Sequence, residues 1–389
     1  MKILYMGDAN FSRLETPLTQ ETSRELLSEV KPYLDEADFR VVNMEEPMGD
    51  KNKYEPISKS GPNLISSAEN ICFYEELNAD IATLANNHIG DYGEAATIDT
   101  LKLIKDHNMK YIGAGKDIEE AYSAVIVEKD GIKVSMMSVC ENEFGVAEEN
   151  KAGSAGYNAL RLCKRIKEEK QKADYVVIVF HGGDEENPIP SPDCVERYRL
   201  IIEFGADAIV AMHTHCPQGY EYYNGKPIIY SMGNFVFQTG SGIADGKVDL
   251  TRPWFYGYMT MLDISKDGIT IDQIIPYRFD HPLSKVTIFK GEDKQKMLDY
   301  IKEISDIIQD KEAMYKHYIG WMSERFQWRI MGDPREETEQ KRLCAYKNLL
   351  TCEAHHSFIK NAYKLYMNHE FDYAKTLYED SKKRAKMPI

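Results

Sequence analysis

Two histidines, His213 and His215, lie one residue apart directly after an apolar run, Asp207–Met212. The run is typical of a buried strand, so both rings are expected at the strand's C-terminal end. An i, i+2 pair on extended backbone points both side chains to one side, and neutral imidazole is the commonest protein ligand for a transition metal. The pair therefore predicts a metal site, with two surface histidines on a loop as the alternative.

Other metal ligands also stand where predicted strands end. They are Asp8 and Asn10 after the first strand, Glu45 after the second, Asn87, His88 and Asp91 after the third, and His181 after a later one. Each has an ordinary explanation on its own, such as a turn cap, a surface carboxylate or a core histidine. However, α/β sheets build their sites outside the carboxyl ends of the strands. The five strand ends together predict one pocket with enough ligands for two ions, and mixed nitrogen and oxygen donors favour Mn, Fe or Zn.

The elements that must position these residues alternate between short β-prone runs and helical periods up to about residue 280, which is typical of an α/β domain. The predicted strands are Lys2–Gly7, Phe39–Asn43, Asp80–Ala85, Tyr111–Gly113, Ser123–Lys129, Lys133–Val139, Asp174–Phe180, Asp207–Met212, Gly219–Tyr223 and Pro227–Met232. Three dipeptides separate β-prone runs in the manner of two-residue hairpins: Asp130-Gly131, Asn224-Gly225 and Asp267-Gly268. Hairpins add antiparallel strands, so the sequence predicts mixed sheets.

Stretches with helical periodicity lie on both sides of Tyr277, after which Gly, Pro and alternating β-prone runs become rare. Those before it are Glu21–Leu34, Glu69–Leu77, Ala95–His107, Leu160–Lys172 and Asp193–Phe204. Those after it are Lys294–Gln309, Glu337–Leu350 and His355–Tyr378. We therefore predict an α/β domain over residues 1–280 and a helical C-terminal appendage over 281–389. The appendage could form a lid, a docking surface or the interface of an oligomer.

Composition narrows the classes of partner. The formal net charge of −15 argues against nucleic acid or an anionic membrane as the principal partner. The seven cysteines are scattered and form no C-x-x-C pair, which indicates reduced thiols. No apolar run approaches membrane-spanning length, and Lys2–Met6 is too short for the apolar part of a signal peptide. These features predict a cytoplasmic protein with no membrane span.

Six motifs follow one another along the chain: Gly7-Asp8, Asn43 to Pro47, Ala85 to Gly93, His181 to Glu185, His213 to His215 and Tyr230 to Phe235. In this order they resemble the motifs of CapA-type capsule or poly-γ-glutamate biosynthesis proteins, whose domain is similar to calcineurin-like metallophosphatases. The resemblance covers about residues 1 to 240. It implies a metallophosphatase-like sandwich of two facing mixed β-sheets flanked by helices.

The resemblance also implies a ligand set. Asp8, Asn10, Glu45 and His215 would hold one ion, and Glu45, Asn87, His181 and His213 the other. Glu45 would bridge the two, while His88 would face the substrate as a general acid with its ring oriented by Asp91. Asn10 stands where the phosphatases usually carry histidine and Glu45 where they carry aspartate, so a one-metal site is an alternative. Gly233 and Asn234 resemble a motif that holds the floor of the site by hydrogen bonds.

Two functions follow from these residues. The first is a metal-dependent hydrolase that uses metal-bound hydroxide on a phosphoester or a γ-glutamyl amide, in a small-molecule or polymer substrate. Arg197 and Arg199 are candidate anion clamps for that substrate, with solvated helix residues as the alternative. The second is a non-catalytic accessory protein of polymer biosynthesis that binds the polymer or a partner. The negative net charge argues mildly against binding a polyanion without bridging cations.

Overall fold

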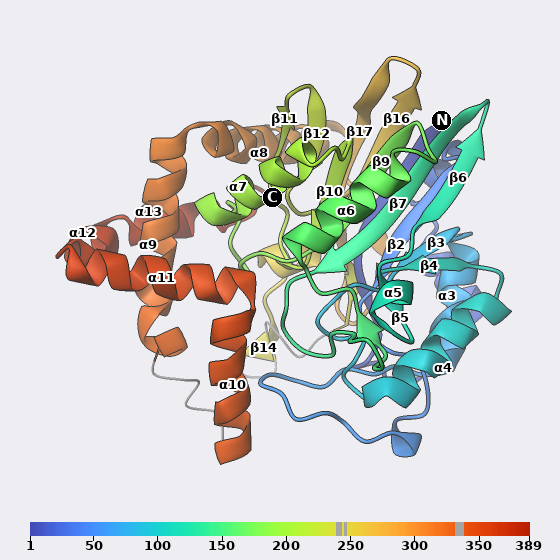
Figure 1. The fold of residues 1–389 in the computed structure, drawn as a ribbon. Helices are drawn as coiled ribbons and strands as arrows, with labels where there is room; N and C mark the ends of the chain where they lie inside the picture. The colour runs from blue at the N-terminus through green and yellow to red at the C-terminus, as the bar shows by residue number, and fades with distance from the viewer. Residues whose placement is uncertain (239–242, 245–246, 331–337) are drawn as a thin grey trace.

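Two mixed β-sheets lie face to face in the computed structural model, which describes residues 1–238, 243–244, 247–330 and 338–389 (Figure 1). The first sheet has the order β18-β17-β16-β1-β2-β3-β4, with β13 also paired to β1. Its strands are β1 (Lys2–Asn10), β2 (Phe39–Met44), β3 (Ile81–Thr83), β4 (Lys110–Ile112), β13 (Asn234–Phe237), β16 (Tyr256–Ser265), β17 (Gly268–Phe279) and β18 (Val286–Ile288).

The second sheet has the order β11-β12-β10-β9-β7-β6. Its strands are β6 (Val125–Lys129), β7 (Ile132–Cys140), β9 (Tyr175–His181), β10 (Ala208–Met212), β11 (Tyr220–Tyr223) and β12 (Lys226–Ile229). Two small pairs, β5 (Ala114–Gly115) with β8 (Gly153–Ser154) and β14 (Ile243–Ala244) with β15 (Lys247–Val248), lie outside the two sheets.

Helices cover the sheets and form the C-terminal region. The α-helices are α1 (Gln20–Leu26), α2 (Lys31–Glu36), α3 (Ile71–Glu76), α4 (Gly93–Asp106), α5 (Ile118–Ala121), α6 (Ala159–Glu169), α7 (Pro192–Glu203), α8 (Gly291–Gln309), α9 (Lys311–Ile330), α10 (Glu339–Thr351), α11 (Glu353–Met367), α12 (Phe371–Thr376) and α13 (Tyr378–Arg384). Three short 3-10 helices are η1 (Lys51–Lys53), η2 (Ala68–Asn70) and η3 (Pro253–Phe255).

The three predicted hairpins are confirmed and make both sheets mixed. Asp130-Gly131 joins the antiparallel strands β6 and β7, Asn224-Gly225 joins β11 and β12, and Asp267-Gly268 joins β16 and β17. In contrast, β1 runs parallel to β2 and β13, and β9 runs parallel to β7 and β10. The parallel strands therefore end together at one edge of each sheet.

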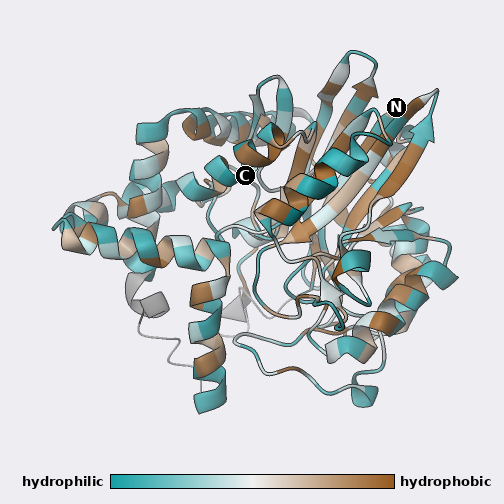
Figure 2. Ribbon diagram, in the orientation of Figure 1, coloured by the Kyte–Doolittle hydropathy of each residue, from teal (hydrophilic) through white to brown (hydrophobic). Residues whose placement is uncertain are grey.

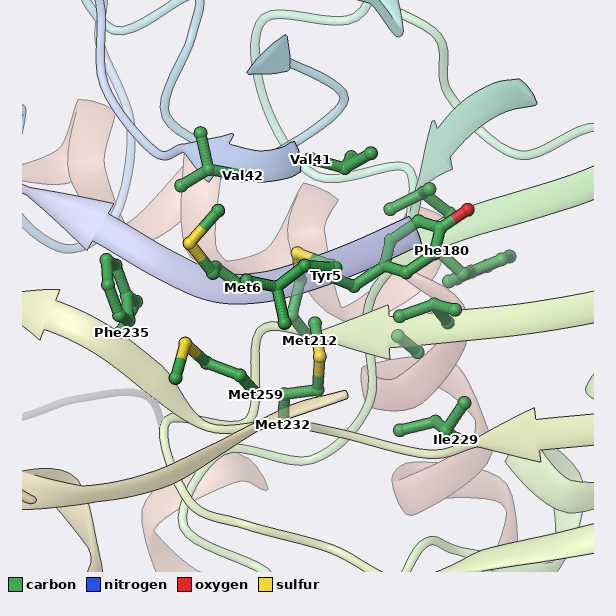
Figure 3. Close-up of a cluster of buried hydrophobic side chains, with 14 of the residues drawn as sticks. Tyr5, Met6, Val41, Val42, Phe180, Met212, Ile229, Met232, Phe235 and Met259 are labelled. Carbon is green, nitrogen blue, oxygen red and sulfur yellow. The ribbon is translucent and has the colours of Figure 1, made fainter. Parts of the chain in front are cut away.

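The core fills the space between the two sheets (Figure 3). Tyr5 of β1 and Met212 of β10 lie there, and the Tyr5 hydroxyl lies 3.4 Å from the sulfur of Met136 in the opposite sheet. Figure 2 shows strands that are mainly hydrophobic and helices with one hydrophobic and one hydrophilic face. This pattern is expected where helices cover the outer faces of the sheets.

Two helix predictions need correction, and one helix was missed. The period over Glu21–Leu34 forms two helices, α1 and α2, with Pro32 in the first turn of the second, where its missing N–H costs little. The period over His355–Tyr378 forms α11, α12 and the start of α13. Helix α9 was not predicted. It contacts α7, α8, α11, α12 and α13, so it buries side chains on several sides and its sequence lacks a single apolar stripe.

The C-terminal helices α8 to α13 gather on one side of the sandwich, at the left in Figure 1. Helix α8 packs on β11 and β17 through Met297, Ile301, Ile304 and Ile308, which are spaced to form one apolar face. The first sheet continues past residue 280, since β18 ends at Ile288. The division into two domains at that residue stays a prediction. Within the described residues, no helix has the length and apolar character needed to cross a bilayer, and all seven cysteines are free thiols.

A close backbone approach fixes how β1 enters the site, and it gives a testable prediction. A β-carbon on Gly7 would lie 1.9 Å from the carbonyl oxygen of Gly233. Gly7→Ala must therefore separate two backbones, and we expect it to lower the free energy of unfolding by about 3 kcal/mol, measured in urea. Gly225→Ala is the control, because its β-carbon meets nothing within 4 Å and its φ of 75° costs about 1 kcal/mol. Equal losses in the two variants would contradict the steric argument.

Candidate metal centre

The strand ends that the sequence singles out meet at one place between the sheets. In the strand register, Asp8 of β1 lies opposite Asn43 of β2 on one side and Asn234 of β13 on the other. In the second sheet, His181 ends β9 beside Met212, the last residue of β10. The carboxyl ends of strands from both sheets therefore face a shared buried space.

Two groups of buried side chains in this space have the composition and spacing of metal sites. Glu45, His181 and His213 form the first, and Asp8, Glu45 and His215 form the second. In each group, one candidate ligand atom from every residue lies within 4.8 Å of the others. Glu45 belongs to both groups, which places it where a carboxylate shared by two cations would stand.

The first group is completed by an amide oxygen. His181 Nε2 lies 3.0 Å from His213 Nδ1, 3.1 Å from Asn87 Oδ1 and 3.7 Å from Glu45 Oε1. Burial, reinforced by the rings of His213 and His215, lowers the pKa of His181 well below its usual range. A neutral imidazole is the form that binds a cation, so four donor atoms from separate elements surround one point.

The second group is held in place by neighbours of His215. The Nδ1 atom of its ring lies 2.8 Å from Asn234 Oδ1, and Nε2 lies 3.9 Å from Glu45 Oε1. The ring packs against Trp254 and Phe237, with centroid separations of 4.4 and 5.0 Å. The Asn234 contact agrees with the expectation that this residue supports the site by a hydrogen bond. It also leaves Nε2 as the nitrogen that faces the shared carboxylate.

Glu45 supplies the test of whether a cation fits. Its side chain is 0% exposed, and neither carboxylate oxygen has a hydrogen-bond partner among the described residues. Burial, followed by the negative charge of Asp8, raises the pKa of Glu45 well above its usual range. A buried carboxylate without partners is strongly unfavourable unless a positive charge compensates it. The donor set therefore fits a divalent cation between the histidines and the carboxylates.

Asp8 is also buried but has partners. Its Oδ1 accepts a 2.7 Å hydrogen bond from Asn43 Nδ2, and its Oδ2 accepts a 3.0 Å bond from the backbone N–H of His213. Burial raises the pKa of Asp8, while His215 and these two bonds oppose the rise. The role of Asn43 was not predicted. The available signal was its position two residues before Glu45 at the end of a strand.

Asn10 lies beside the groups in a supporting position. Its Nδ2 donates a 3.0 Å hydrogen bond to the backbone carbonyl of Glu45, and its Oδ1 accepts bonds from the N–H and hydroxyl of Ser12 at 3.1 and 2.7 Å. In this arrangement the amide oxygen is engaged with Ser12, and the side chain braces Glu45. That Asn10 binds a metal stays a prediction.

His88 follows Asn87 and is held by a buried pair of charges. Its Nδ1 lies 2.6 Å from Asp91 Oδ2, and Asp91 Oδ1 accepts a 2.6 Å hydrogen bond from Lys59 Nζ. Burial acts to raise the pKa of Asp91, but Lys59 and His88 outweigh it and hold the pKa below its usual range. The predicted pair of His88 and Asp91 is thus brought together. Lys59 was missed because it stands in a loop with no strand or motif to mark it.

Arg197 and Arg199 are not placed as anion clamps. Arg197 Nη1 donates a 2.5 Å hydrogen bond to the buried Glu141, and Arg199 makes two bonds of 2.8 and 2.7 Å to Glu221. Both guanidinium groups are therefore engaged with carboxylates of the chain. Neither prediction, an anion clamp or a solvated helix residue, describes these two arginines. Their partner carboxylates lie after β7 and in β11, so the pairing could not be predicted from the sequence of the helix.

Comparison with known proteins gives relatives with capsule-related names. The chain is 32% identical over 219 residues to the capsule biosynthesis protein CapA of Bacillus anthracis, which covers 54% of this chain and 53% of that protein. It is 28% identical over 240 residues to the PGA biosynthesis protein CapA of Bacillus subtilis, which covers 61% and 63%. The matches thus span between about half and two thirds of these relatives.

Among solved structures, a novel phosphatase from Mycoplasma pneumoniae aligns over 71% of this chain and 92% of its own, with 13% identity and a TM-score of 0.44. Similarity at this level carries no argument about activity. The family model described as bacterial capsule synthesis protein PGA_cap matches residues 2–239, the span that contains every predicted site residue. The chain therefore belongs to the PGA_cap family of bacterial capsule synthesis proteins, as its motifs indicate.

Proposed function

We propose that this protein is a metal-dependent hydrolase acting on a phosphoester or on a γ-glutamyl amide. The observation that carries the proposal is Glu45, a fully buried carboxylate that belongs to both candidate metal groups and accepts no hydrogen bond from the described residues. Structural carboxylates in a core are bonded to donors. A carboxylate that lies among three histidines and Asp8, with no donor from the described part of the chain, is better explained by a cation than by packing.

The residues divide into two ligand sets. Asp8, Glu45 and His215 would hold one ion and Glu45, Asn87, His181 and His213 the other, with Asn10 as a further candidate for the first. Mixed nitrogen and oxygen donors favour Mn, Fe or Zn. When bound, such ions supply an activated water and neutralise negative charge on the substrate.

His88 is proposed as the group that transfers a proton to the leaving atom. Its Nδ1 is held by Asp91, and no hydrogen bond to a described residue engages Nε2. Lys59 and Asp91 fix the ring, so Nε2 keeps one direction. A positioned imidazole of this kind typically contributes about 10²–10⁴-fold to a rate.

Metal analysis with an activity screen tests the proposal. Purified protein is expected to contain a transition metal and to hydrolyse a phosphomonoester, a phosphodiester or a γ-glutamyl peptide. His181→Ala and His213→Ala each remove one donor, so both metal content and turnover should fall together. His107→Ala is the control, because His107 is paired with Glu75 away from the site. Full metal content in both site variants would contradict the proposal.

A second function, an accessory protein that binds polymer without turnover, is favoured by the relatives' names in capsule and PGA biosynthesis. Binding of poly-γ-glutamate would then be expected with no release of product. Because the net charge is −15, that binding should depend on divalent cations. Assays of binding and turnover on one preparation, with and without Mn²⁺, separate the two functions.

A further inference from the structure

Two C-terminal helices, which lie beyond the span matched by the family, contact the loop that follows β7. Asn348 of α10 donates a 3.1 Å hydrogen bond from Nδ2 to Glu143 Oε2. Next to it, Glu353 of α11 accepts bonds of 2.9 and 2.6 Å from the backbone and side chain of Asn142. Residues 142 and 143 are therefore held in place by hydrogen bonds to helices α10 and α11.

Glu143 in turn faces one of the candidate ligands. Its Oε1 lies 3.8 Å from His213 Nε2, and its side chain is only 10% exposed. The other nitrogen of the ring, Nδ1, lies 3.0 Å from His181 Nε2 on the side of the metal group. His213 thus points one nitrogen at the metal group and the other at a carboxylate. Metal-binding histidines commonly have a carboxylate at the second ring nitrogen that fixes their orientation and tautomer, and Glu143 stands at that nitrogen at an ion-pair distance.

The other ligand histidine of the pair shows the same arrangement with a different partner. His215 has Nδ1 at Asn234 and Nε2 toward Glu45. Asn234 lies inside the span matched by the family, residues 2–239, whereas Asn348 lies outside it. One histidine is therefore oriented by the α/β core and the other through a helix of the C-terminal region.

We propose that helix α10 positions a metal ligand: Asn348 holds Glu143, and Glu143 orients His213 so that Nδ1 faces the cation. The proposal rests on the metal site of the proposed function. It makes Glu143 and Asn348 positioning residues, and it makes the C-terminal helices part of the site. Removal of either residue should weaken cation binding even though neither belongs to a candidate ligand group.

The experiment is calorimetric titration of the metal-free full chain with Mn²⁺. Glu143→Ala and Asn348→Ala are expected to weaken binding about 10-fold or more, the usual effect of losing a residue that orients a ligand. Glu143→Gln should restore most of the affinity. Its amide oxygen can accept from His213, and its NH₂ can donate to Asn348 once the Asn348 amide turns over and presents Oδ1, a buried atom without a partner among the described residues. Leu350→Ala is the control on the same helix, since Leu350 is highly exposed.

The outcomes distinguish a failure of this inference from a failure of the proposed function on which it rests. Wild-type affinity in both alanine variants, with binding lost in His181→Ala, would overturn the role of α10 and leave the metal site intact. An equal loss in Glu143→Gln and Glu143→Ala would also overturn it, because an oriented acceptor would then not be what matters. A wild-type chain that binds no Mn²⁺ would overturn both proposals. Thermal melting of each variant identifies any loss that comes from unfolding.

Discussion

Glu45→Gln is expected to stabilise the metal-free protein and to remove the stabilisation that Mn²⁺ gives the wild type. The carboxylate is buried without a hydrogen-bond partner among the described residues. Because burial raises the pKa of Glu45 well above its usual range, the metal-free fold must either bury a charge or take up a proton, and a neutral amide of the same shape avoids both. We expect this to add about 1–3 kcal/mol to the free energy of unfolding in EDTA at pH 7. The sign is unusual, because most substitutions at buried positions destabilise a protein.

With metal present, the wild type should become more stable than Glu45→Gln. A ligand at about 1,000 times its dissociation constant stabilises the folded state by about 4 kcal/mol. The wild type should gain this amount in Mn²⁺, and Glu45→Gln should gain much less because it lacks the shared carboxylate. Urea unfolding in EDTA and in Mn²⁺ measures both effects.

Glu46→Gln is the matched control for this comparison. Glu46 is equally buried and burial raises its pKa to about 8, but its Oε1 accepts a 2.6 Å hydrogen bond from the N–H of Phe11 and it belongs to neither metal group. This variant should keep the full response to Mn²⁺. A wild type with the same stability in EDTA and Mn²⁺, or a Glu45→Gln variant that responds like Glu46→Gln, would contradict the assignment of Glu45.

The sequence predicts the parts of this site that follow strands. Asp8, Glu45, His181 and His213 each come directly after or at the end of an apolar run, and the carboxyl ends of parallel strands meet at one edge. Their convergence could therefore be inferred without coordinates. The hairpin dipeptides predict the mixed sheets for a similar reason, since a two-residue turn determines its own strand pairing.

The supporting residues could not be predicted, for a physical reason. Lys59 lies in a loop between β2 and β3, Glu143 lies in the loop after β7, and Asn348 lies on a helix more than 200 residues from its partner. Their roles depend on which surfaces the tertiary fold brings together. A lysine, a glutamate and an asparagine in such settings have the local pattern of solvated residues, and only their burial distinguishes them.

Lys59→Met is the variant for which we expect the largest loss of stability. Lys59 is 3% exposed and Asp91 is fully buried, and the Nζ–Oδ1 distance between them is 2.6 Å. Without the ammonium group, Asp91 keeps only the N–H of Leu64 and the ring of His88 as partners among the described residues. Breaking a buried ion pair from one side typically costs about 3–5 kcal/mol. Urea unfolding should show a loss of that size.

The double variant Lys59→Met with Asp91→Asn makes this prediction specific to the charge. It leaves neither charge buried alone, so it should be more stable than Lys59→Met, a reversal that loss of packing alone would not give. Lys151→Met removes an exposed lysine paired with Glu148 at 2.9 Å and should cost at most about 1 kcal/mol. If Lys59→Met costs no more than this surface variant, the ion pair does not stabilise the fold. If it costs the expected amount, the residue that fixes Asp91, and through it the proposed proton donor His88, is a lysine that lies 29 positions before His88 in an irregular loop.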